Sequence, residues 1–296
     1  MNEVNLINFN EIKNYDNIIY INFWGGFNEA TDNKLKKIFN YLFSQINIDI
    51  VIISVFGNLE SVVKYIDKPN TILVSFSGEN YSLLLKDKND INLVMESKQP
   101  NLNIIPMHLF SITAYERDAW PILLKKRINK KIPLKFCSFL AGNSNNKVRI
   151  KFYQLLNKKK TVDSAGRYMN SIGYSAPTED KEYWKFLSDY KFNICFENTV
   201  KDEYITEKLF HAYMGGCIPI YYGSPKALEY FNKDAFLYLP DSSDESMNTL
   251  IQKILLIDSN DDEYLKIYNQ PLVIGNEIPH EMNVDTWKKE IMKVFN

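Results

Sequence analysis

The chain has 296 residues, of which 45% are hydrophobic, 14% aromatic and 24% charged. This composition is typical of a globular protein and excludes a disordered chain, while the length suits two domains of ordinary size. Lysine and arginine number 35 against 36 aspartates and glutamates, a formal net charge of -1. No overall field therefore favours a nucleic-acid partner, and any bound anion must be held by a local group of residues.

The three cysteines, Cys137, Cys195 and Cys217, each lie in an apolar stretch, which predicts reduced core thiols. The three histidines are far apart and no C-x-x-C occurs, so we expect no metal site. The N-terminal residues lack the pattern of a signal peptide, and no apolar run approaches the ~20 residues of a membrane span. We therefore expect a cytoplasmic protein; association with a membrane surface is left open by the sequence but is not indicated.

Short β-rich runs alternate with helical ones in the first half of the chain. Residues 18–23 predict a strand that ends before Trp24, and residues 33–45 have helical spacing. Residues 48–56 form a nearly continuous apolar run, and residues 71–76 predict a further strand. Continuous apolar runs suit parallel strands that are buried on both faces, so the alternation predicts an open α/β sheet.

A change of composition at residues 124–134, which are basic and poor in apolar side chains, predicts a linker between domains. We expect an N-terminal domain over residues 1–130 and a C-terminal domain over residues 131–278. Residues 279–296 predict a helix that packs back on the first domain. The basic run could attract a phosphate or an anionic lipid, but a solvated stretch is the commoner outcome.

The second half resumes the alternation of strands and helices. Residues 135–140 predict a strand followed by a helical stretch through residue 156. Residues 192–196 predict a strand, residues 202–214 a helix that ends at two glycines, and residues 218–222 another strand. This order predicts a βαβ unit.

Polar residues gather where this βαβ unit passes from strand to helix. The strand delivers Glu197 and Asn198, and the predicted helix carries Tyr204, Glu207 and Lys208 in its first turns. Ligands of open α/β sheets bind at this edge, where helix amides are free and an ammonium can neutralise a diphosphate. Either glutamate could accept hydrogen bonds from ribose or guanine. Acidic residues in a first helical turn are also common on ordinary surfaces, so spacing alone leaves both interpretations open.

Three segments, residues 190–198, 204–208 and 218–225, resemble the signature of the bacterial-type α-1,3/4-fucosyltransferases of glycosyltransferase family 10. The resemblance implies the GT-B fold, an α/β arrangement of two Rossmann-like domains that face each other across a cleft. It also implies that Asn198, Tyr204, Glu207 and Lys208 contact GDP-fucose, with Lys208 at the diphosphate.

The resemblance extends upstream through residues 136–149 and 162–173. Members of the family carry a basic residue near the second of these segments, and it holds a donor phosphate. Arg167 is the first candidate for this role. Arg149, on the helix after a strand, is the second candidate, and its alternative is an exposed helix charge.

The resemblance is weaker over residues 1–130, as expected of a domain that selects the acceptor. Residues 77–80 resemble a Gly-Glu-Asn element that supplies the catalytic base, which assigns that role to Glu79. A carboxylate that accepts the acceptor's proton is what inverting transfer requires, although a lone glutamate after a strand is more often a cap. Trp24 resembles an aromatic residue of an early Trp-Gly element and would stack on the acceptor sugar, with a core tryptophan as the alternative.

The resemblance thus predicts an inverting transferase that moves L-fucose from GDP-fucose to N-acetylglucosamine or glucose in a LacNAc- or Lewis-type glycan, with an α-1,3 linkage. No cofactor is expected, because Lys208, Arg167 and helix amides would assist the leaving diphosphate in place of a metal. Two alternatives are another GT-B transferase that uses a different nucleotide sugar, and a non-catalytic sugar-nucleotide-binding protein.

Overall fold

The computed structural model describes residues 7–30, 32–128, 131–275 and 277–295. The chain divides into two compact units. The first contains Met1–Asp118, Asp202–Tyr204 and Ile278–Asn296, and the second contains Ala119–Lys201 and Ile205–Glu277. The chain passes from one unit to the other at Asp118, whereas the sequence led us to expect a boundary at residue 130. Part of the expected linker, residues 129 and 130, lies outside the described residues.

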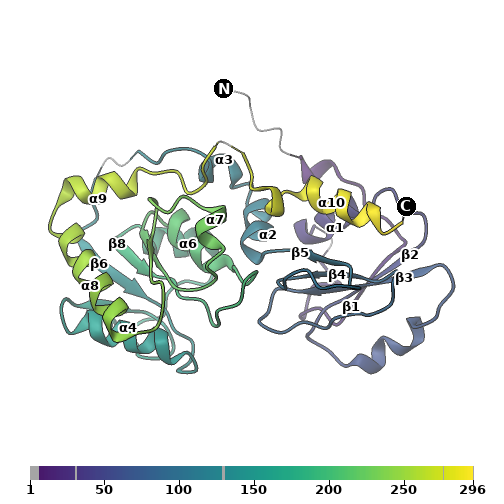
Figure 1. Cartoon of the computed structure of the whole chain (residues 1–296), viewed down its shortest axis with the longest axis horizontal. Coiled ribbons are helices and arrows are strands. Elements are labelled where there is room, and N and C mark those ends of the chain that lie inside the picture. The colour runs from purple at the N-terminus through teal and green to yellow at the C-terminus, as the bar shows by residue number, and fades with distance from the viewer. Residues whose placement is uncertain (1–6, 31, 129–130, 276, 296) are drawn as a thin grey trace. The chain divides into compact units, whose positions relative to one another are not determined.

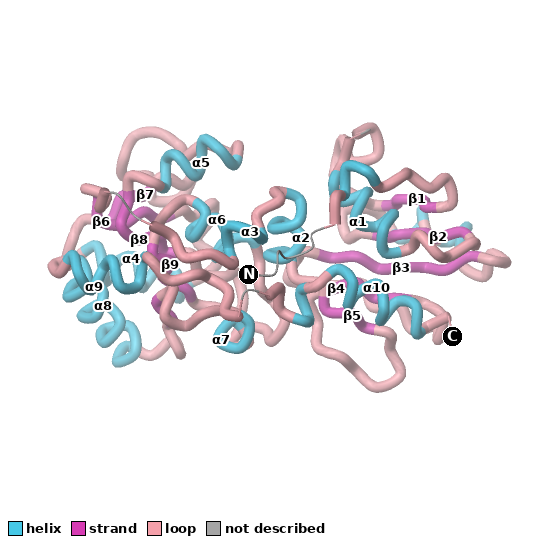
Figure 2. Tube along the Cα trace, turned by 90° about the horizontal axis from the view of Figure 1, so that it is seen from above, coloured by secondary structure: helices cyan, strands magenta, loops and turns pink. Residues whose placement is uncertain are grey.

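The first unit holds a parallel five-stranded sheet in the order β1-β2-β3-β4-β5, which can be followed in Figure 2. Its strands are β1 (Ile18–Ile21), β2 (Asp49–Ile53), β3 (Thr71–Ser77), β4 (Ile91–Val94) and β5 (Ile104–Pro106). Its helices are η1 (Phe9–Glu11), α1 (Lys34–Leu42), η2 (Leu59–Ser61), η3 (Val63–Tyr65), α2 (Leu109–Glu116), η4 (His280–Met282) and α10 (Val284–Lys293).

The helices of the first unit bury the apolar faces that the sequence predicts. Asn33 caps α1 by accepting a hydrogen bond from the Lys36 amide, and its helical repeat buries Leu35, Ile38, Phe39 and Leu42. The C-terminal helix α10 packs against α1, as Figure 1 shows. Trp287 of α10 is buried and meets the Tyr115 ring edge-on, with 6.0 Å between ring centroids. Residues 278–296 are thus part of the first unit.

The second unit also holds a parallel five-stranded sheet, in the order β10-β9-β8-β6-β7. Its strands are β6 (Lys135–Phe139), β7 (Val162–Ser164), β8 (Tyr190–Ile194), β9 (Ile218–Tyr221) and β10 (Leu237–Tyr238). Its helices are α3 (Trp120–Leu123), α4 (Lys147–Asn157), α5 (Asp180–Leu187), α6 (Glu207–Met214), α7 (Ala227–Tyr230), α8 (Asp244–Asp258) and α9 (Asp261–Tyr268). Helices α4, α8 and α9 share the main core with the strands.

The helix predicted over residues 202–214 starts later than expected. Thr206 has extended backbone angles, φ -101° and ψ -174°, and is the N-cap of α6, which begins at Glu207. Residues 202–204 belong to the first unit instead. The prediction that Tyr204 lies in the first turns of this helix is therefore wrong, because Glu203 and Tyr204 take buried positions in the first unit.

Arg127 departs from the solvated basic stretch that the sequence predicts. Its guanidinium lies between the rings of Tyr213 and Tyr268, 3.9 and 4.1 Å from their centroids. It donates hydrogen bonds to the carbonyl oxygens of Tyr213, Cys217 and Tyr268. The carbonyls of Tyr213 and Tyr268 lie at the C-terminal ends of α6 and α9, where the helix dipole is negative. Arg127 is therefore a structural cation that links these two helices.

All three cysteines are buried free thiols, which confirms the prediction made from their apolar surroundings. Within the ranges described above, no helix has the length and apolar character needed to cross a membrane. The same residues contain no group of three or more histidine, cysteine, aspartate or glutamate side chains placed to hold a metal ion.

Candidate functional site

A buried carboxylate organises the carboxyl edge of the second sheet. Glu197 follows β8 and is 1% exposed. One of its oxygens accepts a hydrogen bond from the Thr206 amide at 2.8 Å, and the other accepts one from the Thr206 hydroxyl at 2.7 Å. The Tyr221 hydroxyl donates to it at 3.3 Å, and Lys208 Nζ lies 3.4 Å from Oε2. Glu197 therefore links β8, the last residue of β9 and the start of α6.

The electrostatics of Glu197 are set by burial. Desolvation raises the pKa of its carboxyl, while the Lys208 ammonium and the Thr206 donors act in the opposite direction. The pKa of Tyr221 is also raised. Burial is the larger cause, and the charge of Glu197 adds to it. Gly223 is required beside it, since a Cβ there would lie 2.5 Å from the Tyr221 hydroxyl and 2.6 Å from Glu197 Cγ.

Arg149 is held against this cluster by the cap of α4. The Asn146 side chain accepts a hydrogen bond from the Arg149 amide at 2.9 Å and donates to the Glu197 carbonyl at 2.7 Å. Arg149 is 6% exposed. Its guanidinium donates a hydrogen bond to Asn198 Oδ1 at 3.3 Å. Its buried Nε has no hydrogen-bond partner among the described residues. Burial lowers the pKa of Arg149, and the Glu197 charge opposes that shift.

Arg149 and Lys208 both line one cavity of about 340 Å³ at this edge of the second sheet. The lining also includes Glu207, together with side chains of α5, α6 and β8. The complete lining is Leu140, Arg149, Pro177, Thr178, Asp180, Tyr183, Asn193, Ile194, Cys195, Phe196, Glu207, Lys208 and His211. A buried guanidinium with an open donor, beside an ammonium, is suited to an anionic ligand.

The sequence-predicted residues of the second unit are only partly brought together. Arg149, Glu207 and Lys208 line the cavity, and Asn198 is bonded to Arg149. Arg167 is exposed and is not part of the lining. The structure thus places the second candidate for the phosphate contact, not the first, in the cavity, and the alternative of an exposed charge is wrong for Arg149.

The lining residues His211, Asp180 and Tyr183 are among those that were not singled out from the sequence. His211 lies on α6 four residues after Glu207, a spacing that could have indicated it. It accepts a hydrogen bond from Trp184 Nε1 at 3.0 Å on Nδ1, and its Nε2 lies 3.9 Å from Asp180 Oδ1. Asp180 and Tyr183 come from α5, where no motif marks them.

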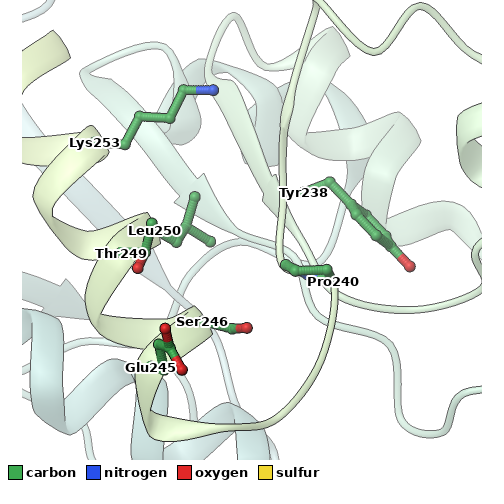
Figure 3. Close-up of a pocket in the computed structure, with 7 residues that line it drawn as sticks. All are labelled: Tyr238, Pro240, Glu245, Ser246, Thr249, Leu250 and Lys253. Carbon is green, nitrogen blue, oxygen red and sulfur yellow. The ribbon is translucent and has the colours of Figure 1, made fainter.

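A second cavity of the same unit, about 280 Å³, lies between α8 and the residues at and after the end of β10 (Figure 3). Tyr238, Pro240 and Leu250 supply its apolar wall, and Glu245, Ser246, Thr249 and Lys253 its polar wall. None of the residues predicted from the sequence lines it. The predicted residues that line a cavity of this unit therefore line the first one.

In the first unit, the predicted residues follow two strands of the parallel sheet, β1 and β3, which are separated by β2. Trp24 comes after β1 and Glu79 after β3, so both lie at the carboxyl edge of that sheet. The Glu79 amide donates to Ser77 Oγ at 3.1 Å, and that hydroxyl donates to the Tyr81 carbonyl at 2.7 Å. Ser77 thus fixes the turn that presents a half-buried Glu79.

Trp24 is 44% exposed, so the alternative of a core tryptophan is wrong. Its ring meets the Phe27 ring at 4.9 Å and the Phe56 ring edge-on at 6.0 Å between centroids. Phe56 follows β2, is 50% exposed and was not singled out from the sequence. The two exposed rings form an aromatic pair at the same sheet edge as Glu79. Tyr204 also belongs to the first unit and is 2% exposed.

Comparisons with known proteins agree with the fold. Residues 129–270 match the model of "Glycosyltransferase family 10 (fucosyltransferase) C-term". The chain is 38% identical over 143 residues to "Alpha-(1,3)-fucosyltransferase FucT" of Helicobacter pylori, covering 47% of this chain and 29% of that protein. It is 31% identical over 204 residues to "GDP-fucose protein O-fucosyltransferase 3" of Xenopus tropicalis, covering 65% and 42%. The chain thus spans less than half the length of these curated relatives.

Solved structures show the same architecture. A crystal structure of an α1,3-fucosyltransferase matches with a TM-score of 0.68 at 24% identity, over 94% of this chain and 88% of that one. A structure titled as that enzyme with GDP-fucose matches with a TM-score of 0.67 at 25% identity and the same coverage. These matches confirm the expected fold, an α/β protein with two Rossmann-like domains of the GT-B type.

The raised pKa of Glu197 predicts how stability depends on pH. The folded state binds the proton of the Glu197 carboxyl more tightly than the unfolded chain does. Protonation of Glu197 therefore contributes fully to the stability of the folded state below the unfolded pKa of 4.5. This contribution is lost as the pH rises through the folded pKa. Glu197→Gln cannot titrate, and its amide nitrogen cannot accept the Thr206 donors, which costs about 1–3 kcal/mol. We expect the variant to be less stable than wild type at acidic pH and the difference to narrow toward neutral pH.

Urea unfolding of both proteins between about pH 4.5 and 8 measures this difference. Glu229→Gln, an exposed change in α7, is the matched control and should leave the difference flat. A Glu197→Gln deficit that stays constant or widens as the pH rises would contradict the assigned cause of the shift.

Proposed function

We propose, from the match of residues 129–270 to the glycosyltransferase family 10 model, that this chain transfers L-fucose from GDP-fucose to a glycan hydroxyl. The observation that carries the proposal is the pair of cations in the cavity of that domain, the buried Arg149 and Lys208. The titles of relatives that name GDP-fucose support the choice of donor.

The donor would bind with its diphosphate at Lys208 and Arg149. When the bond between the fucose anomeric carbon and the phosphate oxygen breaks, negative charge develops on the departing GDP. An ammonium, a guanidinium with an open donor and the amides at the start of α6 stabilise that charge. These groups supply what a divalent metal supplies in other transferases, so we propose that no metal is required. Asn198, Glu207 and Tyr204 remain predicted donor contacts.

The acceptor reaction would use Glu79 as the general base. Its carboxylate takes the hydroxyl proton as the acceptor oxygen attacks the anomeric carbon from the side opposite GDP. One carbon–oxygen bond forms, the bond to phosphate breaks, the proton passes to Glu79 and the configuration at the anomeric carbon inverts. The oxocarbenium-like character of such a transition state explains why charge on the leaving group matters most.

The exposed pair of Trp24 and Phe56 would receive the acceptor sugar. Aromatic faces stack on the C–H face of a pyranose while its hydroxyls stay solvated or hydrogen-bonded. We propose an acceptor that ends in N-acetylglucosamine or glucose within a LacNAc- or Lewis-type glycan, fucosylated in α-1,3 linkage. This choice extends the activity named for the Helicobacter pylori relative to the present chain.

Incubation with GDP-fucose and a panel of LacNAc, Lewis-type and glucose-ending acceptors tests the proposal, with the new linkage located by NMR. Transfer only from another nucleotide sugar would favour the alternative of a different GT-B transferase. Binding of GDP-fucose with no turnover on any acceptor would favour a non-catalytic binding protein. Either result would overturn the proposal.

Removing the cavity cations should weaken GDP binding. Lys208→Ala and Arg149→Ala each lose a charge-assisted contact to the diphosphate, which corresponds to roughly a 10- to 100-fold higher Kd. Titration calorimetry with GDP measures the effect, and Arg167→Ala decides between the two candidate arginines. We expect a smaller effect at the exposed Arg167. GDP affinity that is unchanged in Lys208→Ala would refute the placement of the diphosphate.

Replacing the proposed base should separate chemistry from binding. Glu79→Gln keeps the size of the side chain but cannot accept a proton, so kcat should fall by about 100-fold or more, while the Kd for GDP stays at the wild-type value. Glu96→Gln is a matched control, because Glu96 follows the neighbouring strand β4. Near-normal turnover in Glu79→Gln would remove this residue from the mechanism.

Truncating the aromatic pair should affect the acceptor alone. Trp24→Ala and Phe56→Ala each remove stacking area, and we expect the KM for the acceptor to rise about 5- to 20-fold with an unchanged Kd for GDP. Tyr15→Ala is the control, since Tyr15 is 40% exposed and precedes β1, at the opposite edge of the same sheet. An unchanged acceptor KM in both variants would exclude the pair from the site.

A further inference from the structure

A short segment between the donor residues belongs to the other unit. Residues 202–204, named here the strap, are part of the first unit, while the chain on both sides belongs to the second. Glu197 precedes the strap, and Thr206 follows it and returns to Glu197 through two hydrogen bonds. Between Glu197 and Thr206, the chain therefore passes into the first unit for three residues and then returns to the second.

The strap is fixed in the first unit by a buried pair. Glu203 Oε2 lies 2.9 Å from His108 Nε2, and their side chains are 3% and 0% exposed. A buried carboxylate needs a donor, so His108 carries its proton on Nε2 and donates it to Glu203. The adjacent Tyr204 is also buried. Two consecutive strap residues are thus immobilised side by side.

His108 is itself rigidly placed. It stands between β5 and α2, and its carbonyl accepts hydrogen bonds from the amides of Ser111 and Ile112 at 3.0 and 3.1 Å. It is the N-cap residue of α2 but makes no side-chain cap bond, which leaves the ring available to Glu203. The imidazole therefore offers the strap a fixed anchor at the carboxyl edge of the first sheet.

We infer that His108 is a positioning residue for the donor, acting through Glu203. Ile205 alone joins the strap to Thr206, the cap of α6, so a fixed strap restricts the conformations of the chain that leads into that cap. Without the anchor, the strap must become ordered when the donor binds. The entropy lost in this ordering makes the binding free energy less favourable and so lowers the affinity. The inference rests on the proposed function only for the identity of the ligand, GDP.

His108→Leu tests the anchor, with two readouts. Calorimetry with GDP should give a Kd about tenfold higher than wild type. Hydrogen exchange of the Thr206 amide, which is bonded to Glu197 at 2.8 Å, should become faster without any ligand present. His108→Gln, whose amide can still donate to Glu203, should restore both values to within about threefold. His280→Leu, an exposed histidine of the same unit, should change neither.

If His108→Leu does not fold, the pair His108→Leu with Glu203→Leu replaces it, because apolar replacement of both members of a buried pair is usually compatible with folding. The same rise in Kd and the same faster exchange are expected there. Wild-type values of both quantities in a folded variant would overturn the anchor. A wild-type protein that binds no GDP would overturn the proposed function instead, while the exchange of Thr206 would still decide on the anchor.

Discussion

The burial of the Glu197 carboxylate is the constraint on which the other residues at the carboxyl edge of the second sheet depend. A charge that is 1% exposed must be matched by donors, and here they come from three elements, β9, α6 and the residue that caps α6. Each partner is placed by the others, so Lys208 reaches the cavity only when Thr206 and Tyr221 are in position. Such a network tolerates little change, as the lack of space for a Cβ at Gly223 illustrates.

Local patterns were sufficient to predict most strands. The continuous apolar run at β2 and the spaced apolar residues of α1 carry their structure in a few neighbouring positions. The start of α6 was missed for the opposite reason. Acidic residues at 202 and 203 are typical of a first helical turn, but Glu203 is bonded to His108, which is distant in sequence. A tertiary partner outweighed local propensity, and no local pattern indicates that partner.

The arginines show the same limit in the site. Proximity to a motif favoured Arg167, yet Arg149 is the one whose guanidinium is buried beside the cluster. The backbone of Arg149 is fixed by the side chain of Asn146, the N-cap of α4, which also donates a hydrogen bond to the Glu197 carbonyl. Residue type identified both arginines as candidates, but only the bonds of Asn146 to Arg149 and Glu197 separate them. Arg127 was misread likewise, since its partners are backbone carbonyls that any residue type provides.

The two units carry different groups of the predicted site residues. The family match covers the cations of the cavity and excludes Glu79, Trp24 and Phe56. The cations are bound into one network with Glu197, whereas the aromatic pair rests on its own cluster of rings in the first unit. Because the two networks share none of these residues, the aromatic pair can change without disturbing the cations. Under the proposed function, the acceptor side can therefore change while the donor side is kept.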